Sequence, residues 1–141
     1  MIVGMQVLVD ADNLDVPRLR LLVAALAAAS SADVVVAGAP SALEAIDWPP
    51  QAQVLPAAGW QSADLLLARA YRAADQPLLL ATGDGDFAHL ARRHPGPVLL
   101  VSGRSNRSNT LTAPHITPTD PAQDGGALLR AWITREWPCE S

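Results

Sequence analysis

Short, almost purely apolar runs are the feature that most limits how this chain can fold. Four of them are found at Met5–Val9, Val34–Val36, Leu78–Ala81 and Val98–Val101. Runs of this length are typical of strands that helices cover on both faces. Segments with helical spacing of apolar residues separate them, and parallel strands need such crossovers. The sequence therefore predicts an α/β protein, a three-layer α/β/α domain of Rossmann-like type with a mostly parallel central sheet.

The remaining elements follow from caps, prolines and periodicity. The first helix is expected to open at Asp15 or Val16, with Pro17 in its first turn. Further helices are expected at Pro40–Ile46, at Ala63–Ala74 with Ser62 as N-cap, at Asp86–Arg93 and at Ala122–Trp137. Two weaker strands are predicted at Gln53–Leu55 and, within a polar loop over Arg104–Thr119, at His115–Thr117.

Length and composition narrow the class of protein. The 141 residues suit one domain over 1–141, with a motif-bearing core at 5–104 and a C-terminal loop and closing helix at 105–141. Half the residues are apolar and 17% are charged, which argues against long disorder. No apolar run approaches the roughly 20 residues of a membrane span, and we expect no signal peptide. The single cysteine, Cys139, argues against an internal disulfide or a cysteine-based zinc site and suits a reducing cytoplasm.

Carboxylates follow the predicted strands at the points where the strands end. Asp10 ends the first run, Asp84 and Asp86 follow the run at Leu78–Ala81, and Asp64 falls in the first turn of a helix. The carboxyl ends of parallel strands meet at one edge, where open α/β sheets bind ligands. Converging carboxylates repel one another, so a cation is the natural resolution. Oxygen ligands with no His or Cys partner favour Mg²⁺ or Mn²⁺.

A divalent cation at that edge would suit phosphodiester chemistry. It can polarise the phosphate and activate a water, so that no nucleophilic side chain is needed. The net charge of -4 does not exclude a nucleic-acid substrate, because bound metal would offset part of the acidic cluster. Arg104 and Arg107 lie in a polar loop after the last clear strand and could grip phosphates, although an ordinary solvated loop would look the same.

Three motifs in order along the chain carry a resemblance. Asp10-Ala-Asp-Asn13 follows the first strand, Asp64 opens the middle helix, and Thr82–Phe87 reads Thr-Gly-Asp-Gly-Asp-Phe. A further strand ends near Ser102. Together these segments resemble the NYN domain family of PIN-like metal-dependent ribonucleases, with the Thr-Gly-Asp-Gly-Asp-Phe segment the most specific of them.

The resemblance implies a function and a set of site residues. Asp10, Asp64 and Asp84 would bind Mg²⁺ or Mn²⁺, with Asp86 completing the acidic cluster. Asn13 would position the substrate or a metal-bound water. The implied activity is endoribonuclease hydrolysis of RNA, single-stranded or structured, by a metal-activated water in the cytoplasm. The expected substrate-binding residues are Asn13, Thr82, Ser102, Arg104 and Arg107.

Other functions stay open at this point. Many members of that family carry a second acid on the middle helix, where this chain has Ala68 and Ala70. A catalytically weak or inactive RNA-binding or protein-interaction module is therefore an alternative. Asp10-x-Asp12 with Gly83-Asp84-Gly85 also resembles a HAD-type phosphatase, but the chain has no lysine to hold the phosphate. The composition allows a homodimer, and the small size allows control by a regulatory protein partner.

Overall fold

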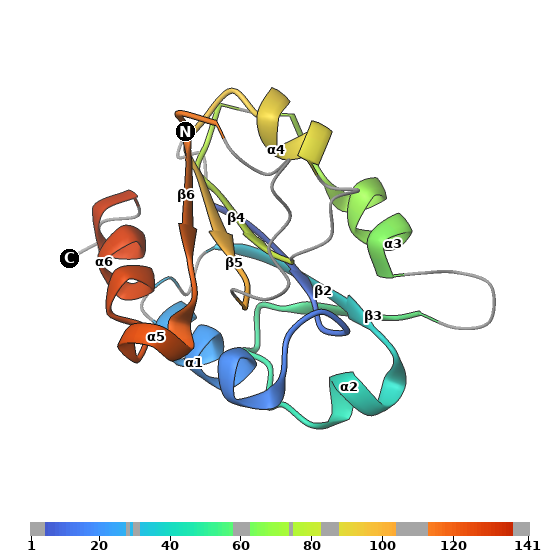
Figure 1. Cartoon of the computed structure of the whole chain (residues 1–141). Coiled ribbons are helices and arrows are strands. Elements are labelled where there is room, and N and C mark those ends of the chain that lie inside the picture. Colours follow the sequence, from blue (N-terminus) through green and yellow to red (C-terminus); the bar gives the residue numbers. More distant parts are fainter. Residues whose placement is uncertain are drawn as a thin grey trace.

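A computed structural model gives the three-dimensional structure of the chain (Figure 1). It describes residues 5–27, 29, 32–57, 63–73, 75–82, 88–103 and 113–136, without the side chains of Asp64, Ala88 and His89. No helix in this part of the chain has both the length and the apolar character needed to cross a membrane.

A six-stranded sheet forms the centre of the structure, and every pair of neighbouring strands is parallel. Its strands are β1 (Gln6–Asp10), β2 (Asp33–Gly38), β3 (Gln53–Pro56), β4 (Leu78–Ala81), β5 (Val98–Val101) and β6 (Ile116–Thr119). They lie in the order β3-β2-β1-β4-β5-β6. The chain therefore builds outward from β1 in one direction and then, from β4, in the other. The prediction of a mostly parallel sheet is confirmed.

Helices cover both faces of the sheet and complete a three-layer α/β/α, Rossmann-like fold (Figure 1). The helices are α1 (Val16–Leu26), α2 (Pro40–Glu44), α3 (Ala63–Ala70), α4 (Ala88–Arg93), α5 (Pro121–Asp124) and α6 (Ala127–Glu136). One buried core joins α1, α2 and α6 to one face of the sheet. A second core packs α3 and α4 on the other face. All four residues of β4 and of β5 are buried, as expected of strands covered on both sides.

The start of α1 shows how the local sequence fixes an element. Asp15 has an extended backbone, and its Oδ1 accepts a hydrogen bond of 3.1 Å from the Arg18 amide. This is N-capping, with Pro17 in the first turn, where its missing N–H costs nothing. The predicted helix start and the role of Asp15 as a cap are confirmed.

The closing helix was predicted wrongly as one continuous segment over Ala122–Trp137. It is broken into α5 and α6 because Gly125 and Gly126 have φ values of 65° and 85°, which end the first helix. Asp124 then accepts hydrogen bonds from the Gly126 amide at 3.0 Å and the Leu128 amide at 2.9 Å, which starts the second. These hydrogen bonds lower the pKa of Asp124, and the bond from the Leu128 amide has the largest effect.

Other element boundaries also differ from prediction, most clearly at α3 and β6. The middle helix ends at Ala70 rather than Ala74. The edge strand predicted at His115–Thr117 is β6, which runs on to Thr119 despite Pro118. Proline lacks an N–H donor, but an edge strand has an outer side on which none is needed.

A buried polar cluster lies at the amino-terminal edge of the sheet, where the strands begin. His94 is 3% exposed, and its Nε2 donates to the Gln76 carbonyl, which can only accept. Nδ1 of the neutral ring therefore accepts from the Tyr71 hydroxyl at 2.8 Å. Burial lowers the pKa of His94, partly opposed by the Gln76 carbonyl. The neutral form of His94 is the one that this cluster fits.

Candidate active site at the carboxyl edge of the sheet

A row of polar residues crosses the carboxyl edge of the sheet. The last residue pairs of the β1–β4, β4–β5 and β5–β6 ladders continue one another, so the residues that follow them come level. Those residues are Asp10, Thr82, Ser102 and Asp120, and all are at most 5% exposed. The strand order reverses between β1 and β4, which is where open α/β sheets form a ligand crevice.

Asp10 is held in a defined orientation by the turn that follows β1. Its Oδ1 accepts a hydrogen bond of 3.1 Å from the Asp12 amide, and its Oδ2 accepts one of 2.8 Å from Asn13 Nδ2. The Asn13 amide also donates to the Asp10 carbonyl at 3.1 Å. The Asn13 side chain therefore binds the Asp10 carboxylate directly, and these two predicted site residues are in contact.

Asp12 points elsewhere. Its side chain is exposed, and its Oδ1 accepts a hydrogen bond of 3.0 Å from the Ala39 amide, at the junction of β2 and α2. Gly38 permits this close approach, because a Cβ on Gly38 would lie 2.9 Å from the Cβ of Ala11. Asp12 therefore links the turn after β1 to the neighbouring strand.

Ser102 has a polar atom without a partner. Its amide donates to the Thr119 carbonyl at 3.1 Å, but its Oγ is buried and makes no hydrogen bond with the described residues. A buried unsatisfied polar group costs about 1–3 kcal/mol. A ligand at this edge that can hydrogen-bond with a hydroxyl would supply the missing partner and recover that cost.

Several predicted site residues cannot be placed. Asp84, Asp86, Arg104 and Arg107 lie outside the described residues. The backbone of Asp64 is in the first turn of α3, as predicted, but its side chain is not described. Among the side chains that are described, no three of the His, Cys, Asp or Glu type lie together as a metal site. That finding covers only one of the four predicted ligands.

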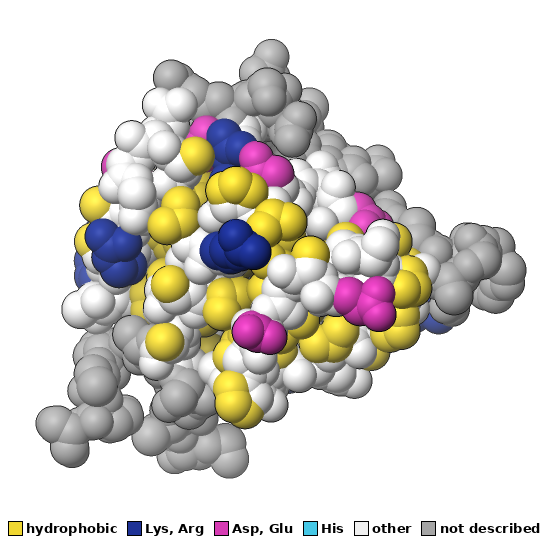
Figure 2. All heavy atoms as spheres, turned by 90° about the horizontal axis from the view of Figure 1, so that it is seen from below, with side chains coloured by type: hydrophobic (Ala, Val, Ile, Leu, Met, Phe, Trp, Pro, Cys, Tyr) yellow, Lys and Arg dark blue, Asp and Glu magenta, His cyan; other side chains and the backbone are white. Residues whose placement is uncertain are grey.

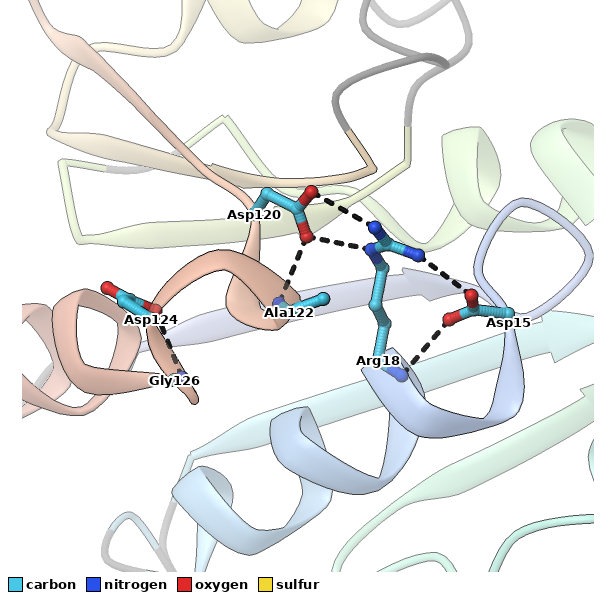
Figure 3. Close-up of polar contacts among 6 residues, drawn as sticks. All are labelled: Asp15, Arg18, Asp120, Ala122, Asp124 and Gly126. Atoms are coloured by element: carbon cyan, nitrogen blue, oxygen red, sulfur yellow. Dashed lines mark hydrogen bonds and ion pairs between the residues drawn. The ribbon is translucent and has the colours of Figure 1, made fainter.

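The structure adds an ion-pair network that the sequence did not predict (Figure 3). Asp120 accepts from Arg18 through both oxygens, from Nε at 2.7 Å and from Nη2 at 3.0 Å. Arg18 Nη1 binds Asp15 at 2.7 Å. The Asp120 side chain is 2% exposed, and its hydrogen bond to Arg18 raises the pKa of that guanidinium. Arg18 also lies against Gly103, because a Cβ added to Gly103 would lie 3.4 Å from Arg18 Cζ.

A local signal for Asp120 was present in the sequence. Asp120 precedes Pro121 and accepts a hydrogen bond of 3.0 Å from the Ala122 amide, which is N-capping with proline at the first helical position. Its pairing with Arg18, 102 positions away, has no local signal.

Comparison of the chain with protein-family models, with curated proteins and with solved structures found no match. The structure defines the fold class, which is a three-layer α/β/α fold. Because such a fold can host many functions, the function has to be inferred from the residues of the site.

Proposed function

We propose that this protein is a Mg²⁺- or Mn²⁺-dependent endoribonuclease that hydrolyses RNA phosphodiester bonds at the carboxyl edge of the sheet. One observation carries the proposal. The buried, oriented carboxylate of Asp10 ends β1, and β1 lies beside β4, the strand that leads into Thr82-Gly83-Asp84-Gly85-Asp86. Only one residue separates Thr82, which is level with Asp10, from Asp84.

The topology supports a common location for the carboxylates. A crossover helix runs back across a parallel sheet, so its first turn starts at the carboxyl edge. Asp64 is in the first turn of α3, and α3 packs on β1 and β2. Asp10, Asp64, Asp84 and Asp86 would hold the cation, which would neutralise phosphate charge and acidify a water when bound.

Two further residues have roles in this proposal. Asn13 keeps the Asp10 carboxylate in place through its 2.8 Å hydrogen bond. Ser102 Oγ would donate its hydrogen to a phosphate oxygen and so gain the partner that it lacks among the described residues. Both contributions are positioning and binding, as hydrolysis by an activated water requires of the protein.

The phosphatase alternative receives less support from the geometry. It needs Asp12 as the proton donor beside Asp10, yet the Asp12 carboxylate is bonded to the Ala39 amide. Asp12→Asn should therefore abolish a phosphatase activity but leave a nuclease activity unchanged.

The test is cleavage of mixed single-stranded and structured RNA with Mn²⁺, Mg²⁺ or EDTA. We expect metal-dependent cutting by the wild type and a loss of at least about 100-fold in Asp84→Asn and Asp10→Asn, since metal ligands supply several kcal/mol. Asp12→Asn is the matched control, because asparagine retains the oxygen that accepts from Ala39. It should cut as the wild type does.

Three results would contradict the proposal. RNA that is retarded on a gel but never cut, with any metal, would indicate a binding module. Cutting that survives Asp84→Asn in a folded protein would remove the acidic cluster from the mechanism. Release of phosphate from a small phosphomonoester, lost in Asp12→Asn, would indicate a phosphatase.

A further inference from the structure

A continuous groove runs along α1, on the part of the surface where α1 meets the segment between α2 and β3. Two adjoining cavities of about 320 and 590 Å³ form it, and they share Val23 and Asp47. We call it the α1 groove. One wall is α1, and the other wall is the segment 44–51. Figure 2 shows hydrophobic side chains gathered on the face that carries α1 and α2, with arginine and acidic side chains among them.

The larger cavity of the groove is mainly apolar, and the wall formed by Trp48 and its prolines is rigid. The Trp48 indole is half-buried, and its Nε1 donates to the Leu43 carbonyl at 3.0 Å, which fixes the ring. Pro49 and Pro50 continue that wall with restricted backbones. On the α1 wall the exposed residues Ala24 and Ala27 are small, so the backbone of a partner could approach closely.

Charges of opposite sign stand on the two walls at the same level of the groove. Arg20 is on the α1 wall, and Glu44 and Asp47 are on the other wall of the same cavity. All three are exposed, and none has an ion-pair or hydrogen-bond partner within the part of the chain that the structure describes. Exposed charges around an apolar groove indicate a contact surface and define what would complement it.

We propose that a second copy of this chain occupies the α1 groove, in a two-fold symmetric dimer. A two-fold axis along the groove places the α1 wall of each copy over the 44–51 wall of the other. Arg20 of each copy then faces Glu44 and Asp47 of its partner, and the charge pairs form twice. The small residues of α1 meet Trp48 and its prolines in the same arrangement. The surface is self-complementary, as a two-fold interface must be.

Sedimentation equilibrium on the full chain tests the dimer. We expect the wild type to have the mass of two chains at micromolar concentration. Arg20→Glu should raise the dissociation constant at least about tenfold, because both Arg20 side chains of the dimer are replaced and their four attractive pairs with Glu44 and Asp47 become repulsive. Arg69→Glu is the matched control. It makes the same change in net charge on exposed α3, on the opposite face of the sheet, and should leave the dimer unchanged.

A charge swap separates a specific interface from general charge effects. Arg20→Glu and the double variant Glu44→Arg/Asp47→Arg should each be monomeric alone. Mixed together, they should form a heterodimer, because each variant then meets the sign that it needs and the second pairing is native. A wild type that stays monomeric up to about millimolar concentration would overturn the proposal. So would a dimer indifferent to Arg20→Glu, or a mixture that fails to associate.

Discussion

Asp15 and Asp120 cap two different helices and bind the same arginine, so replacing each with alanine separates the effect of burial from that of pairing. Asp15→Ala removes one capping bond, worth about 1 kcal/mol, and an exposed ion pair worth at most about 1 kcal/mol more. Asp120→Ala removes a capping bond and both oxygens of a pair in which the carboxylate is 2% exposed. Bonds to a buried charged group contribute about 1.5–3 kcal/mol.

We therefore expect Asp120→Ala to lower the free energy of unfolding by about 2–4 kcal/mol and Asp15→Ala by about 1–2 kcal/mol, in urea titrations at neutral pH. Asp120→Asn should fall between wild type and Asp120→Ala. It keeps an oxygen that can accept from both Ala122 and Arg18 Nε, as Oδ1 does in the native chain. If Asp120→Ala costs no more than Asp15→Ala, the reasoning from burial is refuted.

Two more predictions concern the amino-terminal edge of the sheet and the helix break. Because burial lowers the pKa of His94, the unfolded chain binds a proton first as the pH falls. The stability from neutral His94 should be complete above about pH 6.5 and decrease below it, and urea midpoints at pH 7.5 and 5.5 should differ less in His94→Gln. Gly96→Ala would place a Cβ 2.5 Å from the Gln76 carbonyl oxygen and should cost about 1–3 kcal/mol or more, whereas Gly125→Ala meets open space and should lose only about 1 kcal/mol for its positive φ. Equal thermal shifts for the two alanine variants would contradict this ranking.

The buried strands were the most predictable part of the chain. Leu78–Ala81 and Val98–Val101 were predicted with the bounds that the structure has, because strands covered on both faces show as uninterrupted apolar runs. The helix cap at Asp15 was equally clear. By contrast, the break at Gly125 and Gly126 lies inside a helical apolar pattern that continues through Trp132, so periodicity outweighed the glycines.

The candidate site was predictable where it depends on topology. Asp10 and Asn13 were predicted at the end of the first strand, and the structure shows that this strand is central and that the two residues are in contact. Ser102 and Asp120 come level with Asp10 only through the register of β5 and β6, which no local pattern fixes. The Arg18–Asp120 pair depends on long-range packing for the same reason.

Both edges of the sheet contain a proline, Pro56 in β3 and Pro118 in β6. Each edge strand is only four residues long, so one missing N–H removes a large share of the donors that an incoming strand would use. Edge-to-edge pairing of sheets from separate molecules is therefore disfavoured, which opposes β-linked polymerisation of a chain with half its residues apolar. Self-association of this protein would then use surfaces away from the sheet edges, such as the α1 groove.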